Sequence, residues 1–541
     1  MSQVSGQLID IPNRQIYPAT VHFEQGIIQK IEKIEEAPDQ YLLPGFVDAH
    51  VHVESSMLVP SEFGRLAVVH GTVGTISDPH EIGNVLGVEG VEYMIENGKQ
   101  INFKFHFGAP SCVPATTFET AGAEINIEDV EYLLKKTEIN YLAEMMNWPG
   151  VLFNDETVLA KIEKAKSLGK PIDGHAPGLK GEQAKNYVTA GISTDHECFT
   201  IEEAQDKLDC GMKILIREGS AAKNFEALIP LLDKNYERIM FCSDDKHPDN
   251  LVEGHINLLV KRALTKGNDL YKVLQAACIN PVEHYNMNIG LLKENDPADF
   301  IVINNTDDFN ILQTWINGEL VAENGDSHIP KVENKIINNF ECQPKTADQF
   351  KIAIKGSKVQ VMEALDGQLI TNLLSFESSL VNNPNQTNTD EDILKVTVVN
   401  RYKEASPAIG YIKNIGLKEG AIASSVGHDS HNIIAVGVDD ESIAKAVNLI
   451  IDAKGGVSAV GKGEEHLLKL PVAGIMSEKD GYVVAQSYSK IDAFSKTLGS
   501  PLNSPFMTLS FMALLVIPKA KMSDLGFFDG ETFKFIDVFV D

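Results

Sequence analysis

The sequence has 541 residues, of which 43% are hydrophobic and 23% charged, proportions typical of soluble globular proteins. This length exceeds a single ordinary domain, so we expect two or more domains. The formal net charge is −29, and because so much negative charge repels phosphate backbones and anionic lipid head groups, nucleic acids and membrane surfaces are excluded as expected partners.

The spacing of the cysteines and the first residues of the sequence indicate the cellular compartment in which the protein is expected. The six cysteines are scattered and none has C-x-x-C spacing, so we expect buried thiols in a reducing cytosol instead of a disulfide framework. The first residues show no basic segment followed by an apolar run. The apolar stretch at 511–517 is far shorter than a membrane span. We therefore expect a cytoplasmic protein.

Residues 1–43 are rich in short strand-like runs, and a regular alternation of strand and helix follows. The predicted strand and helix pairs are 46–54 with 61–70, 72–77 with 88–98, 103–107 with 128–136, 141–145 with 155–168, 171–174 with 181–190, 192–196 with 201–208, 213–217 with 225–232, and 238–242 with 251–264. Eight such units predict a (β/α)8 TIM-type barrel over residues 44–290, with Ser61 as the N-cap of the first helix. The same alternation also permits a doubly wound open sheet.

Two further regions follow the predicted barrel. Residues 299–303 and 314–321 are again strand-like, so we expect residues 291–335 to pair with the N-terminal arm in a small discontinuous β-sandwich. Strands and amphipathic helices, such as the helix predicted at 440–453, continue after that. They predict an additional α/β C-terminal domain over residues 336–541.

Histidines and carboxylates fall at the ends of the predicted strands. His50 and His52 end the first strand, and side chains two apart in a strand point to the same side, so both imidazoles can reach one metal ion. By itself this H-x-H pattern is also compatible with two incidental histidines. The ends of later strands add four more metal-binding side chains: Glu144, His175, His196 and Asp244. Barrel active sites form at this face, so the pattern favours a site for two divalent ions.

The residue types define the chemistry of such a site. Imidazoles and carboxylates suit manganese, iron or zinc. A water molecule held between two such ions loses a proton near neutral pH and becomes a hydroxide nucleophile. A carboxylate that contacts this water can accept its proton and deliver it to a leaving group. Asp244 is placed for this role.

Several motifs resemble those of known enzymes. Residues 44–52, Pro-Gly-Phe-Val-Asp-Ala-His-Val-His, resemble the first metal motif of the amidohydrolase superfamily, and residues 295–300, Asn-Asp-Pro-Ala-Asp-Phe, resemble its return into the β-sandwich. Six segments narrow the resemblance to the adenine deaminase family: 52–56 (His-Val-Glu-Ser-Ser), 78–84 (Asp-Pro-His-Glu-Ile-Gly-Asn), 174–178 (Gly-His-Ala-Pro-Gly), 194–197 (Thr-Asp-His-Glu), 243–245 (Ser-Asp-Asp) and 425–432 (Ser-Val-Gly-His-Asp-Ser-His-Asn).

The resemblance implies a role for each ligand. His50, His52 and Asp244 would hold the first metal ion, His175 and His196 the second, and Glu144 would bridge them. Many amidohydrolases use a carbamylated lysine at the position of Glu144, so this glutamate counts against hydrolysis of cyclic amides. Hydroxide would attack C6 of adenine and ammonia would leave, with Asp244 carrying the proton, which gives hypoxanthine.

Other polar residues near the strand ends have two interpretations. Asp78, His80 and Glu81 follow the second strand, where they would contact the purine or transfer a proton, with Glu81 as the second catalytic candidate. The alternative is a structural loop that caps a helix. Glu54 and Ser55 would line the pocket or be solvated loop residues.

The C-terminal domain carries a further candidate cluster. His428, Asp429 and His431 would form a second metal or substrate element, or a hydrogen-bonded turn. His52-Val53-Glu54 imitates the H-x-E half of the cytidine deaminase motif, but the sequence lacks the P-C-x-x-C half.

The function expected from these observations is hydrolytic deamination of adenine in purine salvage, with two divalent ions of manganese or iron, or zinc, in each chain. The resemblance also implies a homo-oligomer, a dimer. An amidohydrolase acting on another purine or a cyclic amide is the first alternative, because pocket loops fix the substrate. A metal-loaded purine-binding protein without turnover is the second.

Overall fold

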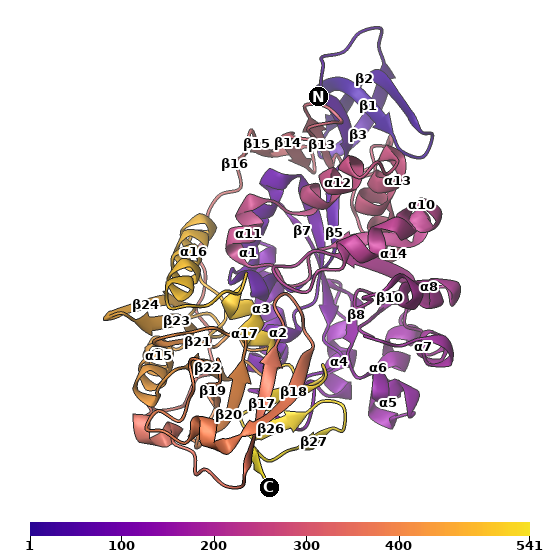
Figure 1. The fold of residues 1–541 in the computed structure, drawn as a ribbon. Coiled ribbons are helices and arrows are strands. Elements are labelled where there is room, and N and C mark those ends of the chain that lie inside the picture. Colours follow the sequence, from indigo (N-terminus) through magenta and orange to yellow (C-terminus); the bar gives the residue numbers. More distant parts are fainter.

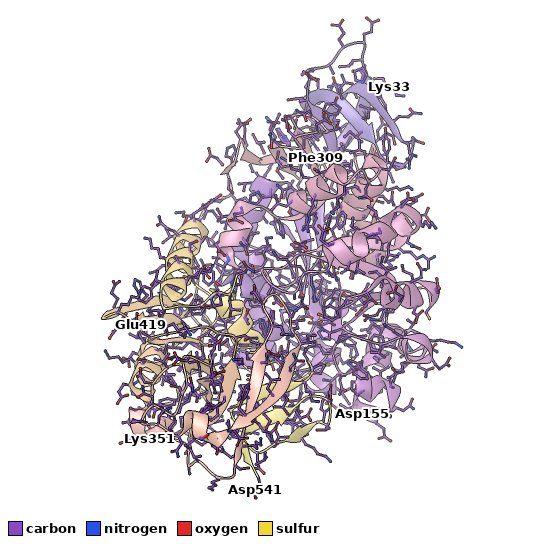
Figure 2. The ribbon with its side chains drawn as sticks, viewed as in Figure 1. Lys33, Asp155, Phe309, Lys351, Glu419 and Asp541 are labelled. Carbon is purple, nitrogen blue, oxygen red and sulfur yellow. The ribbon has the colours of Figure 1, made fainter.

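The computed structural model describes all residues from 1 to 541. In Figure 1 the N-terminal strands lie at one end, a region of parallel strands and helices occupies the centre, and the orange and yellow C-terminal segment packs against one side of that centre. Figure 2 shows Lys33 on the N-terminal sheet, Asp155 on one flank of the centre, and Lys351 and Glu419 on the C-terminal segment. No helix is both long enough and apolar enough to span a bilayer.

One eight-stranded sheet joins the two arms that flank the centre in sequence. Its strands are β1 (Ser2–Asp10), β2 (Gln15–Glu24), β3 (Ile27–Lys33), β4 (Tyr41–Pro44), β13 (Phe300–Ile303), β14 (Ile311–Ile316), β15 (Glu319–Glu323) and β16 (Asp326–Ser327). The arms meet where β13 runs antiparallel to β4. The strand-like run at 314–321 is divided between β14 and β15, because Asn317 and Gly318 adopt left-handed conformations that turn the chain into a hairpin.

The central strands are parallel and follow the order of the sequence. They are β5 (Phe46–Val51), β6 (Thr72–Ser77), β7 (Lys104–Ala109), β8 (Ile139–Met145), β9 (Ile172–Gly174), β10 (Thr194–Asp195), β11 (Lys213–Arg217) and β12 (Ile239–Cys242). They form hydrogen-bonded sheets of five strands, β5 to β9, and three strands, β10 to β12, and not one continuous closed sheet. A doubly wound sheet requires a reversal of strand order, so the sequential order contradicts that alternative.

Backbone contacts bring the two central sheets together. Asp244 N donates to His50 O (2.9 Å) and His52 N donates to Asp244 O (3.2 Å), which places the end of β12 beside the end of β5. At the other junction Ser193 N donates to Ile172 O (2.9 Å). The strands are buried on both faces, and every residue of β5 is buried, as expected for parallel strands covered by helices.

Helices alternate with the central strands. They are α1 (Pro60–Ala67), α2 (His80–Leu86), α3 (Val88–Gly98), α4 (Ile127–Leu134), α5 (Trp148–Leu152), α6 (Glu156–Ser167), α7 (Gly181–Thr189), α8 (Ile201–Asp209), α9 (Phe225–Leu228), α10 (Leu232–Asn235), α11 (Pro248–Glu253), α12 (Ile256–Thr265), α13 (Leu270–Leu274) and α14 (Asn280–Tyr285). Ser61 is not an N-cap: Val59 precedes the helix and Pro60 takes its first position, where the missing N–H costs nothing. The helix predicted at 251–264 is instead the pair α11 and α12.

The C-terminal segment forms a nine-stranded sheet and a three-stranded sheet. The strands are β17 (Lys358–Ala364), β18 (Thr371–Glu377), β19 (Leu394–Val399), β20 (Ala408–Lys413), β21 (Ala421–Ser424), β22 (Ile433–Gly437), β23 (Gly456–Gly461), β24 (Glu464–Lys469), β25 (Ala520–Ser523), β26 (Gly526–Asp529), β27 (Lys534–Phe535) and β28 (Phe539–Val540). The helices are α15 (Asp440–Ala453), α16 (Gly481–Thr497) and α17 (Pro505–Phe511). Asp439 caps α15 by accepting from Ser442 N, and one apolar face of α15 is buried.

This C-terminal segment is docked on the centre by polar contacts. Arg65 on α1 pairs with Asp480 (3.3 Å) at the start of α16, and Glu62 accepts from Gly481 N (2.9 Å). Ser477 N donates to Met57 O (2.8 Å). Because α1 and Met57 follow β5, the docking holds the C-terminal segment close to the carboxyl ends of the central strands.

A buried lysine on β25 predicts a pH-dependent stability. Lys521 donates to Leu369 O (2.6 Å) and Phe511 O (2.8 Å), and burial lowers the pKa of Lys521 to about 7. In the unfolded chain a lysine keeps its proton to about pH 10. Between these values the unfolded state binds more protons, so the contribution of Lys521 to the free energy of unfolding rises with pH, by up to about 1.4 kcal/mol per pH unit.

Urea denaturation of the wild type and of Lys521→Met at about pH 7.5 and about pH 9.5 checks this expectation. The wild type should gain stability relative to the variant as the pH rises. A difference that stays constant with pH would show that Lys521 keeps its proton in the folded protein.

Candidate metal centre

The six predicted metal ligands converge at the carboxyl ends of the central strands. His50 lies within β5 and Glu144 within β8. Three more directly follow strands, His52, His175 and His196, and Asp244 comes two residues after the end of β12. All six are at most 6% exposed. Gly174 makes room for this convergence, because a Cβ at this position would lie 2.4 Å from Thr194 O. The alternation of strands and helices thus brings together residues that are up to 194 positions apart in the sequence.

Three of these side chains form one half of the cluster. His50 Nε2 and His52 Nε2 lie 3.2 Å apart. Asp244 Oδ1 is 3.6 Å from His50 Nε2 and 3.2 Å from His52 Nε2. Three ligand atoms therefore face a common point, as the H-x-H spacing predicts.

Glu144 connects this group to the other two histidines. Its Oε1 is 3.3 Å from His52 Nε2, while its Oε2 is 2.8 Å from His175 Nδ1 and 3.3 Å from His196 Nε2. One carboxylate thus directs one oxygen to each half of the cluster. Glu144 is therefore placed to contact an ion in each half.

The donor set fits divalent metal ions. Tetrahedral ligands about 2.1 Å from an ion lie about 3.4 Å from one another, and the separations given above range from 2.8 to 3.6 Å. His50 Nδ1 and His175 Nε2 are buried and have no hydrogen-bond partner. Because buried imidazoles and carboxylates are costly unless they are paired or bind a cation, the cluster is built for cations.

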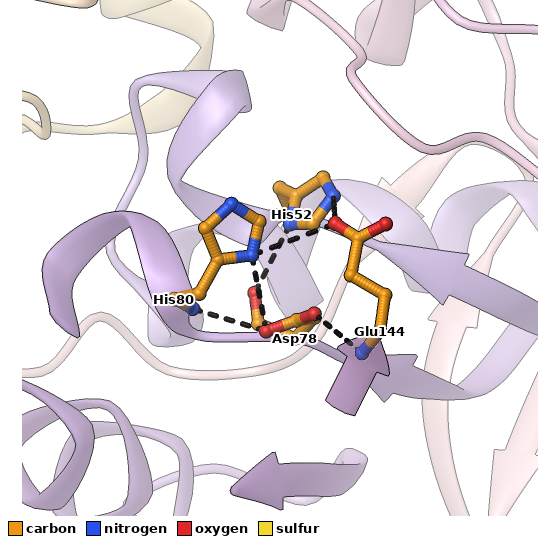
Figure 3. A group of neighbouring side chains, drawn as sticks. All are labelled: His52, Asp78, His80 and Glu144. Carbon is orange, nitrogen blue, oxygen red and sulfur yellow. Dashed lines mark hydrogen bonds and ion pairs between the residues drawn. The ribbon is translucent and has the colours of Figure 1, made fainter. Parts of the chain in front are cut away.

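A second group of metal-binding side chains adjoins the first. Figure 3 shows the side chains of His52, Asp78, His80 and Glu144 close together. They come from the residue after β5, the loop after β6, the start of α2 and β8. His80 Nδ1 lies 3.2 Å from Asp78 Oδ1 and 3.6 Å from Glu144 Oε1. Asp78 also accepts from Glu144 N (3.2 Å). Asp78 therefore positions two neighbours, and His80 extends the cluster toward α2.

The C-terminal segment contributes to the same site. His428 Nδ1 is hydrogen-bonded to Glu81 Oε1, and His431 Nε2 lies close to Glu81 Oε2. Burial lowers the pKa of His431, whereas the neighbouring carboxylates of Glu81 and Asp245 raise that of His428 to about 9 against the effect of burial. Burial opposes ionisation of Glu81, but the imidazoles of His428 and His431 outweigh it and hold the pKa of Glu81 well below its usual range. Asp429 Oδ1 lies 3.8 Å from His80 Nε2. Residues 428–431 form the hydrogen-bonded turn of the second interpretation, which His431 N closes by donating to Gly427 O (2.7 Å), and this turn lies against the metal centre.

Sequence reasoning missed three charged residues of the site. Arg217, the last residue of β11, donates to Asp244 Oδ2 (2.7 Å) and pairs closely with Glu197. Glu197 Oε1 lies 3.5 Å from His196 Nε2, and Asp245 lines the cavity. Burial opposes ionisation of Asp244, but Arg217 and His50 outweigh it and hold the pKa of Asp244 well below its usual range. The strand-end position of Arg217 was the signal that could have identified it.

Glu54 and Ser55 occupy supporting positions. Ser55 Oγ donates to Asp245 Oδ1 (2.5 Å), and Glu54 Oε1 accepts from Ile82 N (3.2 Å) in the first turn of α2. Both are 1% exposed, so the interpretation as solvated loop residues is wrong. Burial raises the pKa of Glu54 to about 7. Neither lines the cavity: Ser55 contacts Asp245, which does, and Glu54 supports the backbone at the start of α2.

The cavity at the centre is lined from both parts of the molecule. Its lining residues are His52, His80, Glu81, Glu144, Met146, His175, His196, Glu197, Asp244, Asp245, Leu369, His428, Asp429, Phe511 and Leu514. The space between them is about 20 Å³, close to the minimum for one water molecule. Phe511 stacks on the ring of His428, with centroids 5.3 Å apart, so the C-terminal segment closes the cavity.

Comparison with known families gives the class of protein that this fold and site define. Residues 41–321, more than half of the chain, match the amidohydrolase family. The protein is therefore an amidohydrolase. Residues 368–534 match the family described as the adenine deaminase C-terminal domain.

Full-length relatives refine the assignment. The adenine deaminase of Salinibacter ruber is 53% identical over 540 residues, with 99% of each chain covered. That of Sulfurovum sp. is 54% identical over 536 residues, with 99% of each chain covered. That of Methanosarcina mazei is 50% identical over 555 residues, with 100% of each chain covered. The chain belongs to the adenine deaminase family.

Solved structures give more distant similarities. N-acetyl-D-glucosamine-6-phosphate deacetylase from Mycobacterium smegmatis is 11% identical with a TM-score of 0.46, and covers 60% of this chain and 100% of its own. A β-aspartyl dipeptidase from Fervidobacterium islandicum is 15% identical with a TM-score of 0.44, and covers 60% of this chain and 98% of its own.

Proposed function

We propose that this protein hydrolyses adenine to hypoxanthine and ammonia. The observation that carries the proposal is the bridging position of Glu144 between two groups of histidines, in a chain about 50% identical to adenine deaminases over its full length. The six proposed metal ligands lie on one side of the site. Glu81, in contact with His428 and His431, places a further charged group on the other side. A planar heterocycle with ring nitrogens and an exocyclic amine matches such a site.

Two divalent ions of manganese, iron or zinc fit the donor set. His50, His52 and Asp244 would hold the first, His175 and His196 the second, and Glu144 would contact both. When bound, such ions lower the pKa of a coordinated water and so supply a nucleophile at neutral pH. The bridging glutamate supplies an anion directly from the chain.

Asp244 carries the proton in this proposal. Its Oδ1 faces His50 and His52 while its Oδ2 accepts from Arg217. Arg217 keeps the carboxylate ionised and fixes its orientation, so that Oδ1 faces the proposed ion site, where it would accept a proton from the attacking water and pass it to the departing amine.

Glu81 binds and orients the purine. As an ionised carboxylate held by His428 and His431, it presents a fixed negative group to a ring N–H of the substrate and receives or returns a proton there. His428 and His431 act as positioning residues. Phe511 and Leu514 offer the apolar surface against which the flat ring packs.

The closed cavity requires movement for adenine to reach the centre. About 20 Å³ is far too small for a purine, so segments that carry Phe511 or His428 shift when the substrate binds. A neighbouring pocket of about 340 Å³ shares Met146 with the cavity and includes Trp148 and Phe533. We infer that the purine approaches through this pocket.

We also propose a division into domains, a compartment, a metabolic role and an oligomeric state for this protein. The sequential strand order and the backbone bonds between β12 and β5 support a (β/α)8 barrel over residues 44–290. The pairing of β13 with β4 supports a β-domain built from residues 1–43 and 291–335, followed by the domain at 336–541. Six unpaired cysteines support a reducing, cytoplasmic environment. We further propose that the enzyme acts in purine salvage and assembles as a dimer.

Ammonia release from a panel of adenine, adenosine, guanine, cytosine and dihydroorotate tests the function with metal-reconstituted protein. We expect release from adenine alone, its loss on chelation and its return with manganese or iron. Turnover of another compound but not adenine would retain the metal centre and reject the substrate. Thermal stabilisation by adenine without ammonia release would indicate a purine-binding protein.

A further inference from the structure

A basic pocket lies on the outer side of the central region, apart from the metal centre. It is bounded by the loops that follow β11 and β12 and by α12, and its volume is about 630 Å³, within the range of about 300–1,000 Å³ for small-molecule sites. Five cationic side chains line it: Lys223, Lys246, Lys261, Arg262 and Lys266. Only two carboxylates, Glu218 and Glu253, line it with them. Although the chain has a net charge of −29, cations outnumber carboxylates in the lining of this pocket.

Lys246 is the residue that distinguishes this pocket from an ordinary basic surface. It is only 6% exposed, lines the pocket, and forms none of the hydrogen bonds or ion pairs of the protein. The other lysines that are at least nine-tenths buried all donate to an oxygen: Lys161, Lys207, Lys345, Lys395 and Lys521. Lys246 is thus a largely buried cation that no protein group neutralises and that lines the pocket, and because burial of an unpaired charge is costly, this arrangement is that of a site for an external anion.

The other four cationic side chains of the pocket differ in whether a carboxylate already pairs with them. Lys223 and Lys261 are exposed and form no ion pair, so both are free to move toward a ligand. Arg262 pairs with Glu218 (3.0 Å) and Lys266 pairs with Glu226 (2.6 Å). Three unpaired lysines therefore face one open pocket, and the two paired cations add to its positive potential.

We propose that this pocket binds a phosphate-bearing small molecule, between inorganic phosphate and a nucleoside monophosphate in size. A tetrahedral oxyanion has enough acceptor oxygens for Lys246 at the base of the pocket and for Lys223 and Lys261 at its rim. In α/β barrels, phosphate sites frequently form at the loops after the seventh and eighth strands, the positions that β11 and β12 hold in the central strand order. The polar lining, with only Leu258 and Leu259 as apolar members, favours such an anion over an apolar ligand.

The pocket adjoins the metal centre but remains separate from it. Lys246 follows Asp244 by two residues, and Glu218 follows Arg217 directly, yet the two cavities share no lining residue. Binding in the pocket is therefore measurable independently of deamination, and a failure of the proposed function leaves this inference untouched.

Calorimetric titration of the metal-loaded protein with inorganic phosphate, AMP and adenosine at low ionic strength tests the proposal. Binding of phosphate or AMP is expected, with no binding of adenosine to this pocket. Lys246→Gln should raise the dissociation constant at least about tenfold, because it removes a hydrogen bond to a charged group. Lys261→Gln, on the exposed rim, should raise it by a smaller factor without affecting folding. Lys335→Gln, an exposed lysine outside the pocket, should leave it unchanged.

A crystal of the metal-loaded protein soaked in tungstate, a tetrahedral oxyanion with a strong anomalous signal, locates the site. A peak beside Lys246 Nζ supports the proposal. A peak confined to the metal centre, or a dissociation constant that neither Lys246→Gln nor Lys261→Gln alters, overturns it. Tighter binding of AMP than of phosphate would identify a nucleotide as the ligand, and equal binding would identify the free oxyanion.

Discussion

Asp244→Asn is expected to lower kcat for adenine deamination by about 10²–10⁴-fold, the range for loss of a general acid or base. Asparagine keeps the shape of the side chain, but it cannot accept the proton that Asp244 Oδ1 receives. The variant should remain folded, since Arg217 retains Glu197 as its partner. Steady-state ammonia release and metal content measured on the same preparation check this result.

Two comparisons distinguish a loss of activity caused by impaired proton transfer from one caused by loss of metal. Asp452→Asn, at an exposed position on α15, is the matched control and should retain full activity. Asp244→Asn reloaded with metal to the wild-type content should stay inactive. Near-normal turnover at full metal content would exclude Asp244 as the proton carrier.

Glu81→Gln is expected to lower kcat by about 10²-fold or more, with unchanged metal content. Glu81 is outside the two proposed ligand groups, and its carboxylate is held by His428 and His431. Glutamine removes the negative charge and leaves the two imidazoles without their partner. Kinetic assays and metal analysis of the variant give both quantities.

The positioning role of the C-terminal imidazoles is tested by His431→Asn. This variant should lower kcat less than Glu81→Gln does and shift the pH profile of kcat/KM, because Glu81 then loses one of the two imidazoles that favour its charged form. His466→Asn, on β24, is the control and should alter neither quantity. A wild-type kcat and pH profile for His431→Asn would show that His431 has only a packing role.

Several elements were predictable from local pattern. The strands at 72–77 and 213–217 and the helices at 88–98 and 440–453 have the predicted bounds, because their apolar periodicity and their flanking turn residues agree. One predicted helix was wrong because a contact with a distant segment interrupts it. The helix predicted at 251–264 is broken around Gly254 and His255, where His255 Nε2 bonds to Asp48 Oδ2 (2.7 Å), a partner 207 residues away that no local pattern reveals.

The candidate ligands were predictable for a different reason. His50 and His52 share a face because side chains alternate along a strand, and Glu144, His175, His196 and Asp244 follow because parallel strands end at one edge. The roles of Glu54 and Ser55 were not predictable, because burial and hydrogen-bond partners depend on neighbouring loops. The contact between Glu81 and His428, 347 residues apart, was equally outside local reasoning.

The sequence by itself determined the class of chemistry, since histidine and carboxylate types at strand ends specify a site for divalent ions whatever the exact packing. The sequence also determined the alternation of strands and helices that brings the strand ends together. This alternation depends on apolar periodicity and turn residues, which are local properties of the chain. Only the tertiary structure decided which charges meet. The contact of Glu81 with His428 joins segments 347 residues apart, and that of Arg217 with Asp244 joins neighbouring strands. In both, burial makes an unpaired charge costly and therefore favours the pairing in space.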